Sequence, residues 1–354
     1  MTTRQSKPKP YTGYRSFQYL EPGVDYQPFR LAREVGRVEP YVVPVSPEQE
    51  RTVQEILDEE LVISLHDHPF VTPEDAAEIV AYNRQGRQWT GYEGLSISRI
   101  DVIFDNFMDG TALITSNAGW KWTDIIHDIG MRYSDLAHQE MVFVATTVDD
   151  LLHAKREGKI ALVPSLEAAT PIENELDRVD VLYGLGIRCM GIAYSEANSL
   201  GAGLREARDG GLTEFGRQVV RRMNRLGMAI DVSHSGDQTA YDTIEVSEKP
   251  IFITHVGARA VEYHAHEAGL GPARLRREGW RDRHRGGAAH DPDRATPRPF
   301  HRLLHGAFRV RGEPRRHRPR RLRAGHHVRR PRGHPPRLRP AVVDFPEPSG
   351  PAIQ

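Results

Sequence analysis

The sequence predicts an α/β fold in which a parallel β-sheet is covered by helices. Short apolar runs of strand length alternate with helical stretches between residues 46 and 255, and this alternation is typical of parallel sheets. Several runs end at a histidine or a glutamate, as barrel strands that open onto a shared site do. The chain has 354 residues, 38% of them hydrophobic, which is enough for one large domain. Together these observations favour a TIM-like (β/α)8 barrel.

The first helix is indicated by its capping residues. The sequence Ser46-Pro47-Glu48-Gln49 is a capping-box pattern with proline at the first helical position, so we expect a helix from 47 to about 60. The apolar run 61–65 predicts a buried strand that ends at His66-Asp67-His68. Residues 95–140 fit no single pattern, and the stretch 106–122, rich in Gly, Asn and Trp, is expected to be a long loop over a site.

The same strand–helix unit recurs as far as His255. Each expected strand is a short apolar run that stops at a polar residue, and the first two expected helices are followed by a glycine, the second of them also being amphipathic. The strands are expected at 159–166, 187–193, 228–232 and 250–254, and the helices at 173–185, at 213–226 and up to 246.

Composition restricts where the protein works. A single cysteine, Cys189, excludes an intramolecular disulfide and is typical of a reducing compartment. No apolar run approaches the ~20 residues that span a bilayer, and the chain opens without a charged-then-apolar leader. We therefore expect a cytoplasmic protein without membrane contact, with a polar N-terminal extension at 1–45 that is rich in Pro, Tyr and Arg.

Residues that bind metals stand where the apolar runs stop. The carboxyl ends of all strands of a parallel barrel open onto one face, so their side chains converge. Imidazole and carboxylate groups are the ligands that zinc accepts in sites open to water. One histidine among the 17 of this chain would more often be a surface or hydrogen-bonded residue, so the coincidence of several carries the prediction. The expected ligands are His66, His68, Glu167, His234 and His255.

Five short motifs resemble a known family. They are Ser165-Leu166-Glu167-Ala168-Ala169, Leu182-Tyr183-Gly184-Leu185-Gly186-Ile187-Arg188, Gly211-Leu212-Thr213-Glu214-Phe215-Gly216, the run from Asn224 to His234, and Ile253-Thr254-His255. In this order they resemble the membrane (renal) dipeptidase family across residues 60–260. The resemblance implies a barrel of the metal-dependent hydrolase type with a cofactor of two Zn2+ ions. Glu167 would bridge the ions, with His66 and His68 on the first and His234 and His255 on the second.

The resemblance also implies a substrate class and a mechanism. The family hydrolyses dipeptides, often with a D-residue at the C-terminal position, and some members open β-lactams. Two ions lower the pKa of a water between them and polarise the scissile carbonyl, and a carboxylate relays a proton to the leaving amine. Glu167 and Tyr194 are the expected catalytic residues. Tyr194 stands where the family places a substrate-binding histidine, and its hydroxyl can donate a hydrogen bond to an oxyanion.

The chain departs from the family pattern at two further places. His66-Asp67-His68 replaces a His-x-Asp motif and resembles the His-x-His of the wider amidohydrolase group. From about 262 to 348 there is no Ile, Lys, Met, Asn, Gln, Ser or Cys, and no periodic apolar pattern remains. We interpret 262–354 as a frame-shifted, disordered segment, because a reading one nucleotide forward permits strand-like sequence ending in Gly-Pro-Asp near codon 325. The barrel at 46–261 would then be partial, and the chain as it stands poorly folded and weakly active.

Two other functions fit parts of the sequence. His66, His68 and Tyr194 would also suit another amidohydrolase-type metal hydrolase, such as a lactonase or a deaminase. The arginine-rich tail would suit an inactive remnant that binds nucleic acid, although such tails normally contain lysine as well. The sequence leaves open the dipeptide that is cleaved, the choice of zinc over other divalent metals, and the oligomeric state, a homodimer included.

Overall fold

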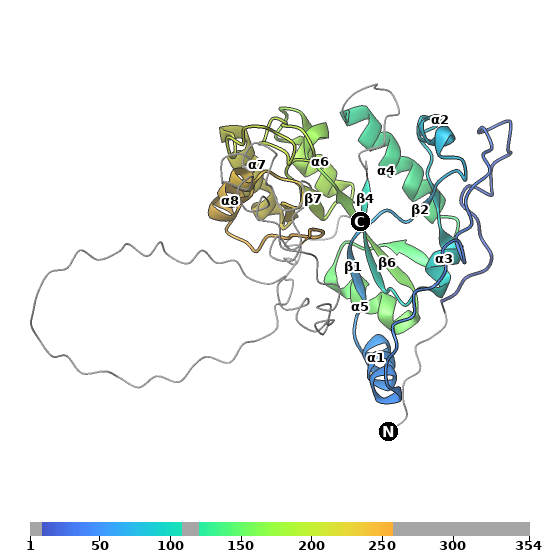
Figure 1. Cartoon of the computed structure of the whole chain (residues 1–354). Coiled ribbons are helices and arrows are strands. Elements are labelled where there is room, and N and C mark those ends of the chain that lie inside the picture. The colour runs from blue at the N-terminus through green and yellow to red at the C-terminus, as the bar shows by residue number, and fades with distance from the viewer. Residues whose placement is uncertain (1–8, 108–119, 258–354) are drawn as a thin grey trace, which may run out of the picture. The chain divides into compact units, whose positions relative to one another are not determined.

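The computed structural model describes residues 9–107 and 120–257 (Figure 1). The arginine-rich segment 262–354 and most of the predicted loop 106–122 lie outside these residues. The strands are β1 Ile63–Asp67, β2 Phe70–Val71, β3 Trp89–Thr90, β4 Val102–Phe107, β5 Val142–Val144, β6 Ile160–Leu166, β7 Cys189–Gly191 and β8 Ala229–Asp231. The helices are α1 Pro47–Glu59, α2 Ile79–Asn83, α3 Tyr92–Ile97, α4 Trp122–Leu136, α5 Val148–Glu157, α6 Arg178–Gly184, α7 Glu214–Leu226 and α8 Asp237–Val246, with short 3-10 turns at Ala76–Glu78 and Thr170–Ile172.

The main sheet is parallel, which confirms the predicted fold class. Its strands lie in the order β1-β4-β6-β7-β8, with β5 also paired to β6. Beyond β8, Phe252 makes a parallel bridge to Asp231 and extends the order by one position. Strands β2 and β3 form a separate antiparallel pair. Helices connect successive parallel strands, as crossovers between such strands require (Figure 1).

The sheet curls back toward its own first strand. Five inter-strand steps separate β1 from the chain at Phe252, a distance of roughly 24 Å in a flat sheet with about 4.8 Å between strands. The ring centroids of His66, on β1, and His255, just after Phe252, are only 3.6 Å apart. Curvature of this kind is what a barrel requires. The described residues therefore have the strand arrangement of a (β/α)8 barrel over the strands they contain.

Alternate residues of the strands build two separate cores. Larger side chains, such as Ile103, Leu162 and Met190, pack on the outer side against helices α4, α6 and α7. The second core includes the smaller strand residues Val102, Ala161, Val163, Cys189 and Ala229, together with Phe104 and with Leu151 and Ala154 of helix α5. Small residues inside the curl leave room for the opposing strands, and Phe104 reaches across to Phe252 at 6.3 Å between ring centroids.

Capping residues account for where several helices begin and end. The predicted capping box at Ser46 and Gln49 is present at the start of α1. Helix α7 begins after Thr213, whose hydroxyl accepts from the N–H of Gly216, and it ends at Gly227 with φ of 78°. The predicted helix 173–185 is wrong at its start, because Glu173 has φ of 54° and follows a 3-10 turn, so α6 begins only at Arg178.

The N-terminal segment, expected as a polar extension, contributes buried side chains at 14–17. Tyr14, Ser16 and Phe17 are buried, and all three donate hydrogen bonds to the Asp135 carboxylate on α4 at 2.6–2.8 Å. Residues 37–45 are exposed. Three well-placed donors are enough to anchor an otherwise polar segment. None of the helices in the described part of the chain is long and apolar enough to span a bilayer.

Candidate metal centre

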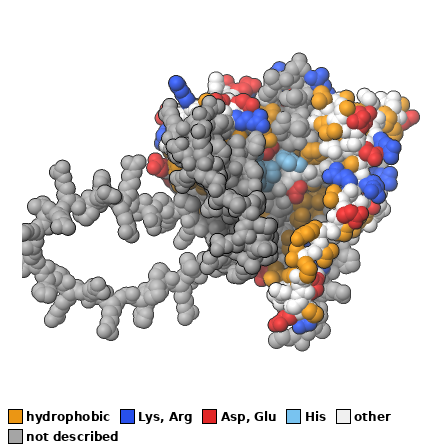
Figure 2. Space-filling model, in the orientation of Figure 1, with side chains coloured by type: hydrophobic (Ala, Val, Ile, Leu, Met, Phe, Trp, Pro, Cys, Tyr) orange, Lys and Arg blue, Asp and Glu red, His pale blue; other side chains and the backbone are white. Residues whose placement is uncertain are grey.

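All five predicted ligands lie together at the carboxyl ends of the parallel strands. His66 belongs to β1 and His68 follows it. Glu167 comes directly after β6, His234 follows β8, and His255 follows the bridge at Phe252. Histidine side chains reach the surface near the middle of the face shown in Figure 2. The strand ends therefore converge as the parallel sheet requires.

A bulge in β1 directs the first histidine pair toward the others. The register runs from Ser64 opposite Ile103 to Asp67 opposite Asp105, so β1 uses one residue more than β4 over this interval. An inserted residue changes which following side chains point inward. His68 therefore lies opposite Asn106, whose backbone carbonyl is 3.1 Å from its Nδ1, and Asp67 turns to the other face.

Glu167 is the hub of the cluster. Its Oε1 lies 3.2 Å from Nε2 of His234, 3.6 Å from that of His66 and 3.9 Å from that of His255. Its Oε2 lies 3.9 Å from Nε2 of His68. The two histidine pairs also meet internally, with Nε2–Nε2 distances of 3.1 Å within His66 and His68 and 2.6 Å within His234 and His255. Six potential ligand atoms from five residues thus lie close together.

The spacing and the charge of these ligand atoms suit a bound divalent metal ion better than they suit direct contacts between the side chains. Two ligands on a tetrahedral zinc with bonds of about 2.0–2.1 Å lie roughly 3.3 Å apart, which is close to the distances of 3.1, 3.2 and 3.6 Å found here. His66, Glu167 and His255 offer ligand atoms within 4.8 Å of one another. Glu167 is 5% exposed, and its Oε2 has no hydrogen-bond partner among the residues that the structure describes. A buried carboxylate in that state is costly unless a cation balances it.

The protonation of the histidines also suits a metal. Burial first, and then the neighbouring His255, His68 and His234, lower the pKa of His66 to about 3. Burial, followed by the neighbouring His234, lowers the pKa of His255 from its ordinary value. Both rings are therefore neutral at pH 7, and neutral imidazole is the form that coordinates metal.

Tyr194 lies beside the second histidine pair. The ring centroid of Tyr194 is 4.2 Å from that of His234, and the ring centroid of Trp120 lies 5.3 Å from that of Tyr194. Gly203 allows the loop after β7 to close here, because a Cβ at that position would overlap the backbone of 194–196. The structure thus brings Tyr194 to the rim of the cluster.

Sequence reasoning missed several residues that shape this centre. Gly191 ends β7, and a Cβ there would overlap the backbone carbonyl of Glu167. Asp231, Ser233 and Thr254 form a hydrogen-bonded group behind the second histidine pair. This group could have been predicted from the sequence, because Ser233 directly precedes His234 and Thr254 directly precedes His255. A glycine at the end of a strand beside the predicted glutamate was the signal for Gly191.

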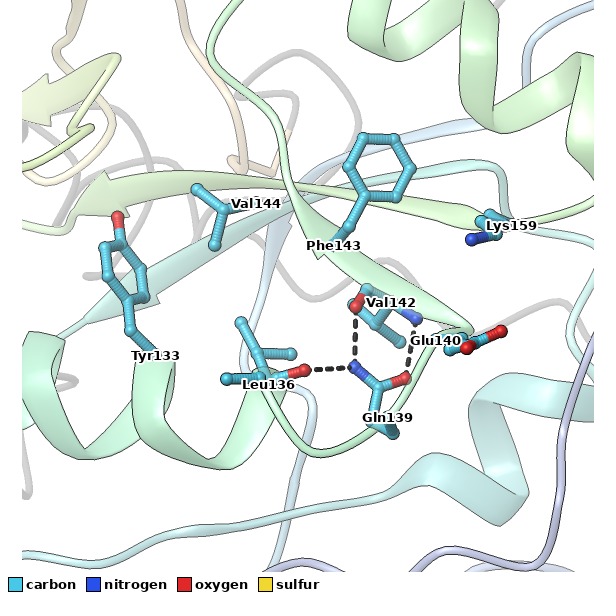
Figure 3. A pocket seen from close by; sticks show the side chains of 9 residues that line it. Tyr133, Leu136, Gln139, Glu140, Val142, Phe143, Val144 and Lys159 are labelled. Atoms are coloured by element: carbon cyan, nitrogen blue, oxygen red, sulfur yellow. Dashed lines mark hydrogen bonds between the residues drawn. The ribbon is translucent and has the colours of Figure 1, made fainter.

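A second hollow, of about 590 Å3, lies near the opposite end of the sheet. Figure 3 shows Gln139 in this hollow, where its side-chain amide bonds the backbone of Leu136 and Val142. Val142 begins β5 and Lys159 precedes β6, so the hollow borders the amino ends of these strands. The histidines follow the carboxyl ends, and the hollow is therefore not part of the metal centre.

Comparison with known proteins identifies one family. Residues 127–269 match the family described as membrane dipeptidase (Peptidase family M19). Dipeptidase verJ of Clonostachys rogersoniana is 31% identical over 144 residues, which are 40% of this chain and 36% of that protein. Dipeptidase tcpJ of Claviceps purpurea is 29% identical over 162 residues, 45% of this chain and 37% of that protein. The chain spans between 36% and 51% of the length of the curated relatives it matches.

The solved structures give a weaker likeness. The probable dipeptidase PvdM from Pseudomonas aeruginosa aligns with a TM-score of 0.48 and 20% identity, over 63% of this chain and 59% of that one.

Proposed function

We propose that this chain, which belongs to the membrane dipeptidase family through residues 127–269, hydrolyses the peptide bond of dipeptides at a centre of two zinc ions. The observation that carries the proposal is the convergence of four imidazoles on the buried Glu167 carboxylate. The family match includes Glu167, His234 and His255 but not His66 or His68. Geometry alone brings those two to the same place, so their position supports the proposal independently.

Each residue has a proposed role in the reaction. Metal ions bound at such a centre activate a water molecule and polarise the scissile carbonyl. We propose that Glu167 is shared by both ions, that His66 and His68 hold one, and that His234 and His255 hold the other. Tyr194, on the rim beside His234, would donate its hydroxyl proton in a hydrogen bond to the oxyanion that forms from the carbonyl.

Metal removal and a substrate panel test the proposal. The purified protein would be stripped with a chelator, reloaded with Zn2+, Mn2+ or Co2+, and assayed on dipeptides that end in an L- or a D-residue. N-acetylated dipeptides, lactones and aminopurines would be assayed beside them. We expect metal-dependent hydrolysis of free dipeptides only. Preferential opening of lactones or deamination would instead assign another hydrolase of the amidohydrolase group, and stable metal binding without turnover would support an inactive remnant.

The dipeptidase activity of this chain is proposed to depend on the segment that follows residue 261. The resemblance places the proton-relay aspartate beyond His255, where the sequence turns to Arg, His and Pro. We propose that the gene is frame-shifted there and that a chain read one nucleotide forward from about codon 262 is the more active form. Resequencing of codons 255–348 checks this directly. Stop codons in the forward frame would mean that the arginine-rich tail is genuine, and the peptidase assignment would then be dropped.

A further inference from the structure

Asp231 is a buried carboxylate next to the metal centre that is not among the expected ligands. It ends β8 and is 5% exposed. Its Oδ1 accepts from the hydroxyl of Ser233 at 2.6 Å and from the backbone N–H groups of Ser233 and Thr254 at 3.1 and 3.3 Å. Its Oδ2 accepts from the hydroxyl of Thr254 at 2.6 Å. A buried carboxylate with this many donors is fixed in one orientation.

The hydroxyl protons in this group determine the tautomer of His255. Oγ1 of Thr254 lies 2.9 Å from Nδ1 of His255. A threonine hydroxyl has a single proton, and Thr254 donates that proton to Asp231, so it can only accept from His255. Nδ1 of His255 must therefore carry a proton. The lone pair is then on Nε2, which is the atom that faces Glu167 and His234.

The alternative arrangement is unfavourable. If Thr254 donated to His255 instead, Oδ2 of Asp231 would lose the one hydrogen-bond donor that the described residues give it. A buried acceptor without a partner costs roughly 1–3 kcal/mol, and more when it is charged. Ser233 cannot replace Thr254 in this role, because its own proton is donated to Oδ1 at 2.6 Å.

We infer that Asp231, acting through Thr254, is the positioning residue that holds the His255 ring with Nδ1 protonated and Nε2 free for a metal ion. This inference rests on the proposed metal centre. Partners in the outer shell of a metal site commonly fix the ring and tautomer of a ligating histidine. His68 has a different anchor, the backbone carbonyl of Asn106, which no side-chain substitution removes. The hydrogen-bonded chain from Asp231 through Thr254 to His255, called here the Asp231 relay, is therefore the part of the support that mutation can test.

Asp231→Asn gives the sharpest test. Oδ1 already receives two N–H groups and one hydroxyl, so the amide oxygen must occupy that position and the amide nitrogen must replace Oδ2. The amide nitrogen would then donate to Thr254, and the Thr254 hydroxyl would donate to Nδ1 of His255. The proton of the ring would move to Nε2, which blocks the metal-binding lone pair. A change of one atom that preserves shape is thus expected to reverse the direction of the relay.

Two measurements on the full chain test the inference. Long-range 1H–15N correlation spectra of the metal-free protein report which ring nitrogen of His255 carries the proton, with His255→Gln identifying the signal. Competition with a chromogenic chelator reports Zn2+ affinity. We expect Nδ1–H in the wild type and Nε2–H in Asp231→Asn, with zinc affinity reduced roughly 10–100-fold. Thr254→Val should also lose affinity, whereas Thr254→Ser should bind within a few-fold of the wild type.

A matched control separates positioning from loss of stability. Thr243 is fully buried on α8, and its hydroxyl donates to the carbonyl of Thr239 at 2.7 Å. Thr243→Val should lower the free energy of unfolding as Thr254→Val does, but leave zinc affinity unchanged. Equal losses of affinity in Thr254→Ser and Thr254→Val, or an unchanged tautomer in Asp231→Asn, would overturn the inference. If the wild type bound no metal, the proposed function would fail, while the tautomer spectra of the metal-free protein would still decide the relay.

Discussion

The two histidine pairs reach the same carboxylate by different routes. His66 and His68 come from one strand, and a single bulge in β1 turns them toward Glu167. His234 and His255 come from two successive strand ends and rely on a carboxylate–hydroxyl group for support. The first pair depends on local backbone geometry, and the second depends on contacts between segments about 20 residues apart.

The two pairs are therefore sensitive to different substitutions. In the first pair, no side-chain substitution removes the anchor of His68, because that anchor is the backbone carbonyl of Asn106. The second pair can also be disturbed by substitution of the residues whose hydrogen bonds support His255, namely Asp231, Ser233 and Thr254. Both pairs have one ring, His66 or His234, whose buried Nδ1 has no hydrogen-bond partner in the described part of the chain. The anchored ring of each pair therefore fixes the geometry, and the other ring adapts to it.

Glu167→Gln should have the largest effect, because it affects both pairs at once. The substitution preserves size but removes the charge that all four imidazoles share. We expect kcat/KM for dipeptides to fall beyond the roughly 10–100-fold that loss of an outer partner causes, and zinc content to fall as well. Activity and metal analysis of the same preparation check this. Full zinc content in an active Glu167→Gln protein would show that the pairs do not share this carboxylate.

Removal of one imidazole from each pair separates the two ions. His68→Ala and His234→Ala should each reduce bound zinc from two equivalents to one, because each leaves the other pair intact. Metal analysis after gel filtration measures the stoichiometry. The loss of both ions in either variant would mean that the four histidines form one undivided site, and the contrast between the pairs would disappear.

Gly191→Ala should displace Glu167 without replacing any of the five proposed ligands. The new methyl group would overlap the carbonyl oxygen of Glu167, and strain of this kind costs about 1–3 kcal/mol. Thermal unfolding and zinc affinity should both be reduced. Gly130→Ala is the matched control, because a Cβ there meets nothing within 4 Å in helix α4 and should stabilise by about 0.4–1 kcal/mol. Equal stability of the two variants would contradict the close approach of β7 to Glu167.

The pH dependence of the stability of the metal-free protein should be a smaller effect, and His66 of the first pair should contribute a measurable part of it. The pKa of His66 is lowered to about 3 in the folded chain, chiefly by burial, against about 6.5 when unfolded. The unfolded chain therefore binds the proton first, so stability is full above pH 6.5 and falls as the pH drops from about 6.5 toward 3. Chemical denaturation at several pH values measures this slope. His66→Gln should flatten it, and an unchanged slope would mean that other groups cause the loss.

The sequence predicted which side chains lie together better than it predicted the contacts that support them. His66, Glu167, His234 and His255 could be found because each closes an apolar run, and a parallel sheet gathers such ends. Strand β4 was missed because Asp105 and Asn106 interrupt its apolar pattern. Helix α5 was missed despite its capping box at Thr147 and Asp150 and its left-handed Gly158. The bulge in β1 and the relay behind His255 depend on contacts between distant segments, which no local pattern encodes.

The most direct test of the account is a calorimetric titration of the metal-free wild-type chain with Zn2+. Two equivalents per chain are predicted, one for each histidine pair with Glu167 shared between them, and protons should not be released from His66 near pH 7 because that ring is already neutral. Binding of a single equivalent would contradict the two-ion centre. Absence of binding would contradict the metal site itself and, with it, the proposed dipeptidase activity.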